Sequence, residues 1–282
     1  MPLRHLTSIN RHNRHRLLLL IGVHALWGVG AAALSYTARL FDSHTPGWSA
    51  AFLLVQLLAA TQLLIPLLQL QEEERSRGFY LFWGIVLGVG IWLANLAPVP
   101  QLLTPLADAL KSALLLLTAA LVGATLARYV NRLWEILPLA LAMALADFLS
   151  WFAGPTANFA QQIETWYREP IGPPPAIDMV LVKMAFPGSA NLLPVFGISD
   201  WIMVVFFACV AQRFQINNNL LRLKSTANNR VPYLPLSAAA LLAVILFAQL
   251  SGHFIPALPL IAAIILCGYG LRWLLLKSAG KS

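Results

Sequence analysis

The chain has 282 residues, of which 59% are hydrophobic and only 11% are charged. In a soluble domain about a quarter of the residues are charged. This composition excludes a water-soluble globular protein and predicts an integral membrane protein. The formal net charge of +8 would also suit nucleic-acid binding. However, the basic residues lie in short segments between hydrophobic runs, which favours a topological role, so no nucleic-acid partner is expected.

Eight apolar runs are long enough to cross a hydrocarbon layer about 30 Å thick as helices. The predicted spans cover residues 17–36, 48–70, 79–98, 106–129, 133–154, 191–212, 233–251 and 254–277. With the N-terminus in the cytoplasm, most basic residues between the spans fall on the inner side, and the outer segments hold only Arg39, Arg168 and Lys183. Basic residues collect on the cytoplasmic side of membrane proteins. We therefore expect one all-α polytopic membrane domain over residues 1–282, with both termini in the cytoplasm.

The longest connection predicted outside the membrane, residues 155–190, contains the proline cluster GPPP, which cannot lie inside a helix. It is followed by AIDMVLVKMAF, an apolar run with β-branched valines that is too short to span. This pattern predicts a short strand over residues 178–186 or a segment at the membrane edge. Short loops and the absence of any N-x-S/T acceptor favour a multi-pass protein of a prokaryotic plasma (inner) membrane.

Several ionisable side chains lie inside the predicted spans: His24, Asp108, Lys111, Glu135, Asp147 and Asp200. Asp108 and Lys111 are three residues apart on one helix, so we expect them to form an ion pair. Glu135 is close enough to the inner end of its span to reach the headgroups or Arg132. We expect His24 to be a hydrogen-bonded core or interfacial residue, because a lone histidine makes no metal site.

The remaining chemistry-bearing residues predict neither a metal site nor a cofactor. Cys209 and Cys267 both fall within spans, so we expect buried thiols rather than a disulfide or a metal pair. The sequence has no zinc-ligand spacing, no Walker loop and no dinucleotide fingerprint at a convincing position.

Asp147 and Asp200 differ from these residues, because neither has a basic residue within a turn or two and both lie deep in their spans. Asp147 follows Arg132 by 15 residues, and Asp200 precedes Arg213 by 13 residues. At 1.5 Å per residue, both carboxylates are roughly 20 Å from the inner side. Two carboxylates at one depth are tolerated if they share a proton, and such a pair activates water and polarises a carbonyl group in aspartic proteases. The alternative is that each aspartate hydrogen-bonds within the bundle or lines an ion path.

Three motifs occur in order along the second half of the chain. They are ALADFLSWFAGP around Asp147, FGISD ending at Asp200, and IPALPLI, whose Pro256, Ala257 and Leu258 open the last predicted span. In order, separation and placement they resemble the intramembrane aspartyl proteases of the signal peptide peptidase and presenilin family (GxGD type), here as a prokaryotic homologue. That family carries an aspartate in one helix, GxGD in the next and PAL in its last helix. The resemblance, over about residues 137–260, implies that Asp147 and Asp200 are catalytic.

The resemblance also implies which residues shape the site and what the substrates are. Gly197, Ser199 and the PAL residues would surround the two carboxylates, and transmembrane helices or signal-peptide remnants would be cleaved. The chain departs from the family at Ala146, where tyrosine is frequent, at Ser199, which replaces the second glycine of GxGD, and in having eight spans instead of nine. Serine adds a hydroxyl group and a Cβ beside the carboxylate, so altered specificity or loss of activity is an alternative.

An intramembrane protease must admit water and locally unwind its substrate helix. Pro256 and Pro259 predict an irregular segment that shapes the substrate cleft, with a simple proline kink as the alternative. Val180, Leu181 and Val182 in the predicted strand are expected to pair with the unwound substrate by strand addition. A re-entrant or surface-lying segment fits the same pattern.

The sequence thus predicts an aspartic endopeptidase that needs no metal or cofactor and cleaves transmembrane helices inside the lipid bilayer. Three alternatives remain. The first is a catalytically impaired homologue that binds transmembrane helices. The second is a proton-coupled transporter or channel whose aspartates relay protons. The third is a prepilin-peptidase-like enzyme, against which the PAL motif argues. The sequence does not indicate an oligomeric state.

Overall fold

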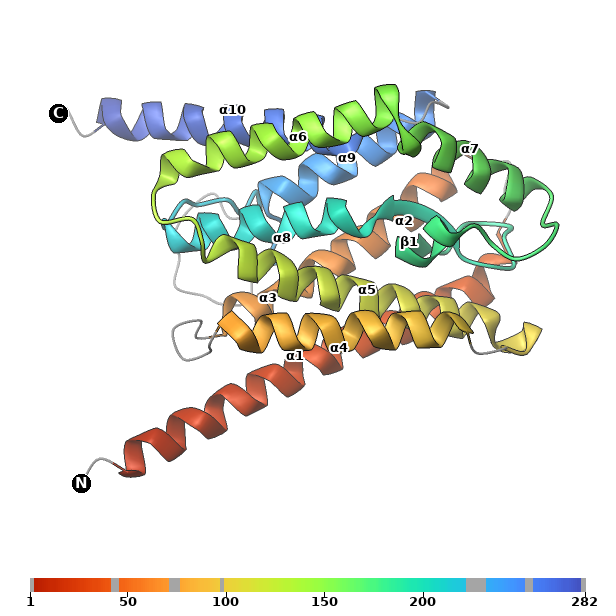
Figure 1. The fold of residues 1–282 in the computed structure, drawn as a ribbon, viewed down its shortest axis with the longest axis horizontal. Helices are drawn as coiled ribbons and strands as arrows, with labels where there is room; N and C mark the ends of the chain where they lie inside the picture. Colours follow the sequence, from red (N-terminus) through yellow and green to blue (C-terminus); the bar gives the residue numbers. More distant parts are fainter. Residues whose placement is uncertain are drawn as a thin grey trace.

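The computed structural model describes residues 3–41, 46–70, 77–96, 99–221, 232–251 and 256–279. They form a mostly helical bundle, 77% helix, with one two-stranded sheet (Figure 1). The α-helices are α1 (Leu3–Ala38), α2 (Pro46–Gln62), α3 (Leu64–Leu68), α4 (Arg77–Leu96), α5 (Thr104–Ala127), α6 (Ile136–Ala153), α7 (Pro155–Arg168), α8 (Ile198–Arg213), α9 (Leu236–Ser251) and α10 (Ala257–Ala279). The 3₁₀ turns are η2 (Gln101–Leu103), η3 (Leu133–Glu135) and η4 (Ala176–Val180), and the strands are β1 (Leu181–Met184) and β2 (Leu193–Gly197).

Within the described residues, five helical segments are long and apolar enough to cross a membrane. They are His15–Ala38, Gly47–Leu68, Arg77–Leu96, Gln101–Ala127 and Leu133–Phe152. The described apolar parts of the last two helices, Leu236–Ser251 and Ala257–Leu271, are shorter. The fold therefore suits a mostly helical membrane protein, as the composition predicts, while the number of spans and the side of the termini stay predictions.

The predicted span over residues 191–212 is wrong in its first part, because Leu193–Gly197 form strand β2 and α8 begins only at Ile198. Pro194 explains the difference. It has no backbone N–H to donate within a helix, and its ring disfavours the helical conformation in the residue before it. Val195 and Phe196 are residue types that favour strands. The sequence did not show where β2 ends and α8 begins, because a buried strand and a buried helix both appear as apolar runs without periodicity.

The predicted loop over residues 155–190 contains a helix, α7, that the sequence did not predict. A single residue, Gly154, separates α6 from α7, and Pro155 occupies the first helical position, where a missing N–H is tolerated. A Cβ atom at Gly154 would lie 3.1 Å from the carbonyl oxygen of Ser150, so the sharp junction suits glycine. The GPPP run is not helical, as predicted, and the strand is shorter than predicted because residues 176–180 form the turn η4.

Helix α5 lies in the middle of the bundle and packs against α1, α4 and α8. Gly123 allows α5 and α8 to approach closely, because a Cβ atom there would lie only 2.7 Å from the Ile202 carbonyl oxygen and 2.8 Å from Val205 Cβ. Every residue of α8 from 203 to 211 is buried. Helices α6 and α9 pack against α10, and α9 also contacts α8, so these helices cover α8 on its other side (Figure 1).

Two of the isolated polar residues have the structural roles that the sequence indicates. His24 is 2% exposed, and its Nδ1 lies 2.8 Å from the carbonyl oxygen of Leu20, which confirms a hydrogen-bonded core histidine. Glu135 accepts hydrogen bonds from the N–H groups of Asn131 at 2.7 Å and Arg132 at 3.2 Å. Glu135 therefore caps the start of its own helix and reaches the backbone of Arg132 rather than its guanidinium group.

Two other predictions about these residues need correction. The expected Asp108–Lys111 ion pair is wrong, because Asp108 Oδ2 pairs with Lys183 Nζ at 3.6 Å, and Lys183 comes from strand β1. The prediction of two buried thiols holds for Cys209, whereas Cys267 is exposed. Both cysteines are free, so they form no disulfide with each other.

Candidate active site

Asp147 and Asp200 line one cavity of about 710 Å³ at the end of the bundle where α6 meets α7. Its walls come from α6, α7, η4, both strands, and the facing parts of α8, α9 and the start of α10. Most of the lining is apolar, and the ionisable groups among the described lining residues are Asp147, Glu164 and Asp200. A mostly apolar cavity with a few convergent polar groups is the usual form of a ligand or active site.

Asp147 is held at the start of the last helix. It lies on α6, which packs against α10, and the backbone N–H of Leu258 donates a hydrogen bond to Asp147 Oδ2 at 3.3 Å. Leu258 is in the first turn of α10, where N–H groups have no acceptor inside the helix. A carboxylate is electrostatically favourable at such a terminus, because the peptide dipoles leave partial positive charge there.

The PAL residues lie around this contact. Pro256 precedes α10, Pro256 and Ala257 line the cavity, and the side chain of Leu258 is buried. The predicted irregular segment is shorter than expected, because Ala257, Leu258 and Pro259 already belong to the helix. Proline is accommodated in the first turn because the N–H groups there have no intrahelical partner.

Asp200 is held at the junction between β2 and α8. It is the third residue of α8, and its Oδ2 accepts a hydrogen bond from the Gly197 N–H at 2.9 Å. A Cβ atom at Gly197 would lie 3.3 Å from Ser199 Oγ and 3.6 Å from Asp200 Oδ2. Gly197 therefore leaves room beside the carboxylate, and exposed Ser199 also lines the cavity.

The two aspartates thus come from different helices and line one cavity. No lysine or arginine is among the described residues that line the cavity, so neither carboxylate has a basic partner there. Two carboxylates that approach within hydrogen-bond distance in a poorly solvated site avoid their mutual repulsion by sharing one proton. Such a pair can accept a proton from water and donate one to a carbonyl oxygen.

The β1–β2 hairpin forms the wall next to Asp200. The strands are antiparallel, with Leu181 opposite Gly197 and Val182 opposite Phe196. The next pair joins Lys183 to Pro194, which leaves Val195 as an extra residue in β2. An extra residue of this kind is a β-bulge, which locally disrupts the pairing of the two strands.

The predicted strand residues fall in different environments. Val180 and Leu181 line the cavity, whereas Val182 is fully buried and does not. On the edge of β1 away from β2, the N–H of Lys183 donates to Ser112 Oγ at 2.9 Å.

Just beyond β1, the N–H of Ala185 donates to Gln56 Oε1 at 2.8 Å. The second edge of β1 is therefore occupied by α5 and α2, and the edge that faces the cavity belongs to β2, whose residues Pro194 to Gly197 line it.

Other parts of the cavity lining were missed by sequence reasoning. Phe159 and Ile163 come from α7, and Val244 and Gln249 come from α9. The spacing of four residues between Phe159 and Ile163, continued by Tyr167, is the signal of an amphipathic helix and could have indicated α7. No comparable signal existed in α9, because a uniformly apolar span does not show which residues face a cavity.

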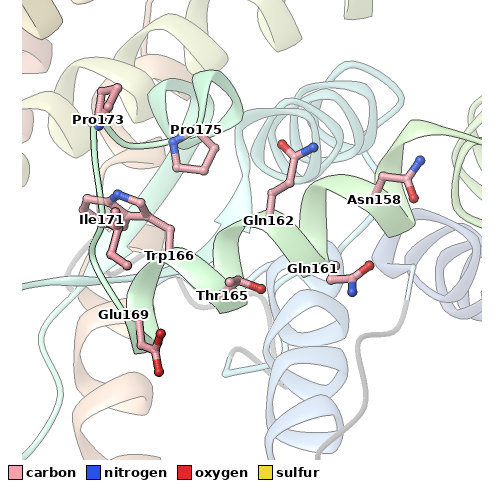
Figure 2. A pocket seen from close by; sticks show the side chains of 9 residues that line it. All are labelled: Asn158, Gln161, Gln162, Thr165, Trp166, Glu169, Ile171, Pro173 and Pro175. Atoms are coloured by element: carbon pink, nitrogen blue, oxygen red, sulfur yellow. The ribbon is translucent and has the colours of Figure 1, made fainter.

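A second pocket, of about 670 Å³, lies on another face of α7 (Figure 2). Asn158, Gln161, Gln162, Thr165 and Trp166 extend into it from α7, and Pro173 and Pro175 lie across from them on the following loop. Its lining includes one carboxylate, Glu169, so this pocket lacks the paired acids of the first. Helix α7 therefore separates a polar surface pocket from the cavity that holds the aspartates.

Among the described residues, no group of three or more His, Cys, Asp or Glu side chains is arranged to hold a metal ion. A scan against protein-family models, a search of curated proteins and a search of solved structures each found no match to this chain.

Proposed function

We propose that the protein is an intramembrane aspartyl protease that hydrolyses peptide bonds of transmembrane helices or signal-peptide remnants. The observation that carries this proposal is that Asp147 and Asp200, from two different helices, line one largely apolar cavity with no lysine or arginine among its described lining residues. The hydrogen bond between Asp147 and the PAL residue Leu258 adds support. So does the resemblance of the three motifs to the signal peptide peptidase and presenilin family.

In the proposed reaction the ionised carboxylate takes a proton from a water molecule, and the water oxygen attacks the scissile carbonyl carbon. The protonated carboxyl donates to the carbonyl oxygen, which carries the developing negative charge. The C–N bond then breaks, and the leaving nitrogen takes up a proton. The pair shares its proton, so neither role is assigned to one aspartate.

The substrate would bind in an extended form along the β2 edge. A helix in lipid hides its peptide bonds in its own hydrogen bonds, so unwinding it leaves N–H and C=O groups without partners. Strand addition replaces those hydrogen bonds. The pairing strand proposed here is β2 rather than β1, because Ser112 and Gln56 occupy the other edge of the hairpin.

The finer topology belongs to the same proposal. Eight spans, both termini in the cytoplasm and a prokaryotic plasma membrane would orient the aspartate helices as in signal peptide peptidase. The distribution of basic residues supports this orientation.

A second candidate function is the binding of transmembrane helices without cleavage. Ser199 and Ala146 favour it, because both depart from the family pattern beside the aspartates. The hydrogen bonds to Gly197 and Leu258 also give each carboxylate a structural role that does not require catalysis.

Cleavage by the purified protein in lipid vesicles tests the proposal. A synthetic peptide with one apolar helix of about 20 residues should be cut, with fragments identified by mass spectrometry. Both Asp147→Asn and Asp200→Asn should lower the rate on the order of 1,000-fold or more, because each removes one partner of a unit. Glu169→Gln is the matched control, since that carboxylate lies outside the cavity, and its rate should be unchanged.

Two results would contradict the protease. Robust cleavage by either asparagine variant would remove the paired mechanism. Saturable binding of the peptide without any cleavage would favour the helix-binding alternative.

A further inference from the structure

A buried lysine lies behind the hairpin wall of the cavity. Lys183 is 9% exposed, and its Nζ lies 2.7 Å from Asp178 Oδ2 and 3.6 Å from Asp108 Oδ2. The Tyr167 hydroxyl group donates to Asp178 Oδ1 at 3.0 Å, and the ring of Tyr167 lies 5.8 Å from Lys183 Nζ. With Ser112, which accepts the Lys183 N–H, these residues form what we call the Lys183 cluster.

The Lys183 cluster joins three consecutive elements of the cavity wall to α5, which lies far from them in sequence. Lys183 belongs to β1, Asp178 to η4, Tyr167 to α7, and Asp108 and Ser112 to α5. None of the five side chains lines the cavity, whereas their neighbours on the same elements do. The cluster therefore lies directly behind the wall of the cavity. It attaches three elements of that wall, α7, η4 and β1, to helix α5 in the middle of the bundle.

The neighbours that face the cavity are Ile163 on α7, Ile177 and Val180 on η4, and Leu181 on β1.

Lys183 keeps its positive charge and Tyr167 keeps its proton at physiological pH. Burial by itself would lower the pKa of Lys183, but the negative charges of Asp108 and Asp178 outweigh it and the pKa is raised. Burial also raises the pKa of Tyr167, and the charge of Asp178 adds to the effect, so its hydroxyl group remains a donor. A buried ion cluster often stabilises a fold no more than apolar side chains of the same size would, but its attraction offsets the desolvation cost only when the geometry is good.

That geometry is connected to Asp200 through two contacts. Leu181, two residues before Lys183 in β1, pairs with Gly197 in β2. The N–H of Gly197 in turn donates to Asp200 Oδ2 at 2.9 Å. A shift of β1 on α5 therefore moves the Gly197–Asp200 junction, while Asp147 stays with α6 and α10.

We propose that Lys183 is a positioning residue, whose cluster sets the place of the β2 edge and of Asp200 relative to Asp147. This inference rests on the proposed protease function. Lys183 does not line the cavity, so it acts through the hairpin and not on the reacting atoms. It fixes which peptide bond of a substrate paired with β2 lies between the two carboxylates.

The first experiment compares Lys183→Met with Lys183→Met/Asp178→Asn in the cleavage assay. The single variant leaves buried carboxylates without their cation, so it lowers both thermal stability and kcat, the latter at least tenfold, and spreads the cuts over neighbouring bonds. The double variant removes one of those charges, so its stability recovers while kcat stays low and the cuts stay spread. Recovery of kcat and of the single cut position together with stability overturns the proposal, because a purely structural role predicts that result.

Lys111→Met is the matched control. Lys111 lies one turn from Asp108 on α5, yet within the described residues it forms no ion pair closer than 4.0 Å. Its removal leaves the cut position and kcat within threefold of the unchanged protein. An equal effect of Lys111→Met and Lys183→Met overturns the assignment to Lys183.

The second experiment does not depend on proteolysis. Val180→Cys, in a Cys267→Ser background, places a thiol on the cavity side of the wall, and its alkylation by a small maleimide is followed in time. Lys183→Met raises this rate at least threefold, whereas Lys111→Met leaves it unchanged. If the unchanged protein cleaves no peptide, the protease proposal fails. The alkylation rate of Val180→Cys then still tests whether Lys183 holds the cavity wall in place. An unchanged alkylation rate in Lys183→Met overturns the positioning role.

Discussion

Each proposed catalytic carboxylate accepts a backbone N–H at the start of a helix. Asp200 accepts from Gly197 within its own junction, and Asp147 accepts from Leu258 at the start of α10. These bonds offset part of the cost of a carboxylate in apolar surroundings, because a buried polar group is expensive mainly when it is not hydrogen-bonded. Both carboxylates also belong to helices and not to flexible loops, and a site built on rigid elements keeps its geometry.

Gly197→Ala tests how closely Asp200 must be held. The φ angle of Gly197 is −80°, so alanine fits the backbone and the unfolding free energy should change by less than about 1 kcal/mol. The added Cβ would press on Ser199 Oγ at 3.3 Å and stand 3.6 Å from Asp200 Oδ2. We expect kcat/KM to fall about tenfold, roughly 1.4 kcal/mol in transition-state stabilisation, with thermal unfolding recorded on the same samples.

The control for this variant is Gly90→Ala on α4, where a Cβ meets no atom within 4 Å. It should leave cleavage unchanged. A loss of activity in Gly197→Ala that merely follows a loss of folded protein would count against the role given to Gly197.

At the scale of residues, the sequence predicted groups that stand out by their chemistry and missed their distant partners. Asp147 and Asp200 could be singled out because an isolated carboxylate in an apolar run has no other easy explanation. The partner of Asp108 could not be predicted, because Lys183 lies 75 positions away and Lys111 was the nearest cation in sequence. Long-range ion pairs follow from packing, which local spacing does not reveal.

At the scale of elements, the hairpin is the largest departure from the sequence prediction. An all-helical bundle would have continued α8 to residue 191, but Pro194 and the pairing with β1 make residues 193–197 a strand. The consequence is functional, because the strand brings a backbone edge to the cavity beside Asp200. The sequence did not predict helix α7, because this helix is short and amphipathic, lies within a proline-bounded loop and lacks the long apolar run that indicates a membrane span.

Val195→Pro tests the β2 edge. Val195 is the extra residue of the bulge and lines the cavity, so the proposal expects its backbone groups to pair with a substrate. Proline removes the N–H and should lower kcat/KM at least about tenfold, since a donor for the substrate is lost. Val195→Ala keeps the N–H while trimming the side chain, and it should lose no more than about threefold.

The measurement is the cleavage rate of the same transmembrane peptide over a range of concentrations. Equal effects of the proline and alanine variants would show that the Val195 side chain matters and the strand edge does not. Val182→Pro is unsuitable for this purpose, because Val182 is fully buried and pairs with Phe196, so the hairpin itself would be lost.

At the scale of the molecule, composition and run length were sufficient to predict a helical membrane protein, because crossing lipid requires long apolar helices. They were not sufficient to fix the number of spans. Helix α8 has 16 residues and is about 24 Å long, less than the roughly 30 Å of a hydrocarbon core, and β2 lengthens the same segment. The cavity lies at the level of this strand, and at the same end of the bundle the start of α10 is bonded to Asp147 of α6.

Two carboxylates that act together on one carbonyl group should bind its tetrahedral form far more tightly than its trigonal form, because catalysis requires preferential binding of the transition state. A substrate-like peptide with a hydroxymethylene group at the scissile position presents that geometry, and the same peptide with a plain methylene group lacks the hydroxyl. The most direct test is the ratio of their dissociation constants for the purified protein. We expect a preference of at least about 100-fold for the hydroxyl peptide that disappears in both Asp147→Asn and Asp200→Asn. Equal affinities, or a preference that survives in either variant, would contradict an aspartyl protease.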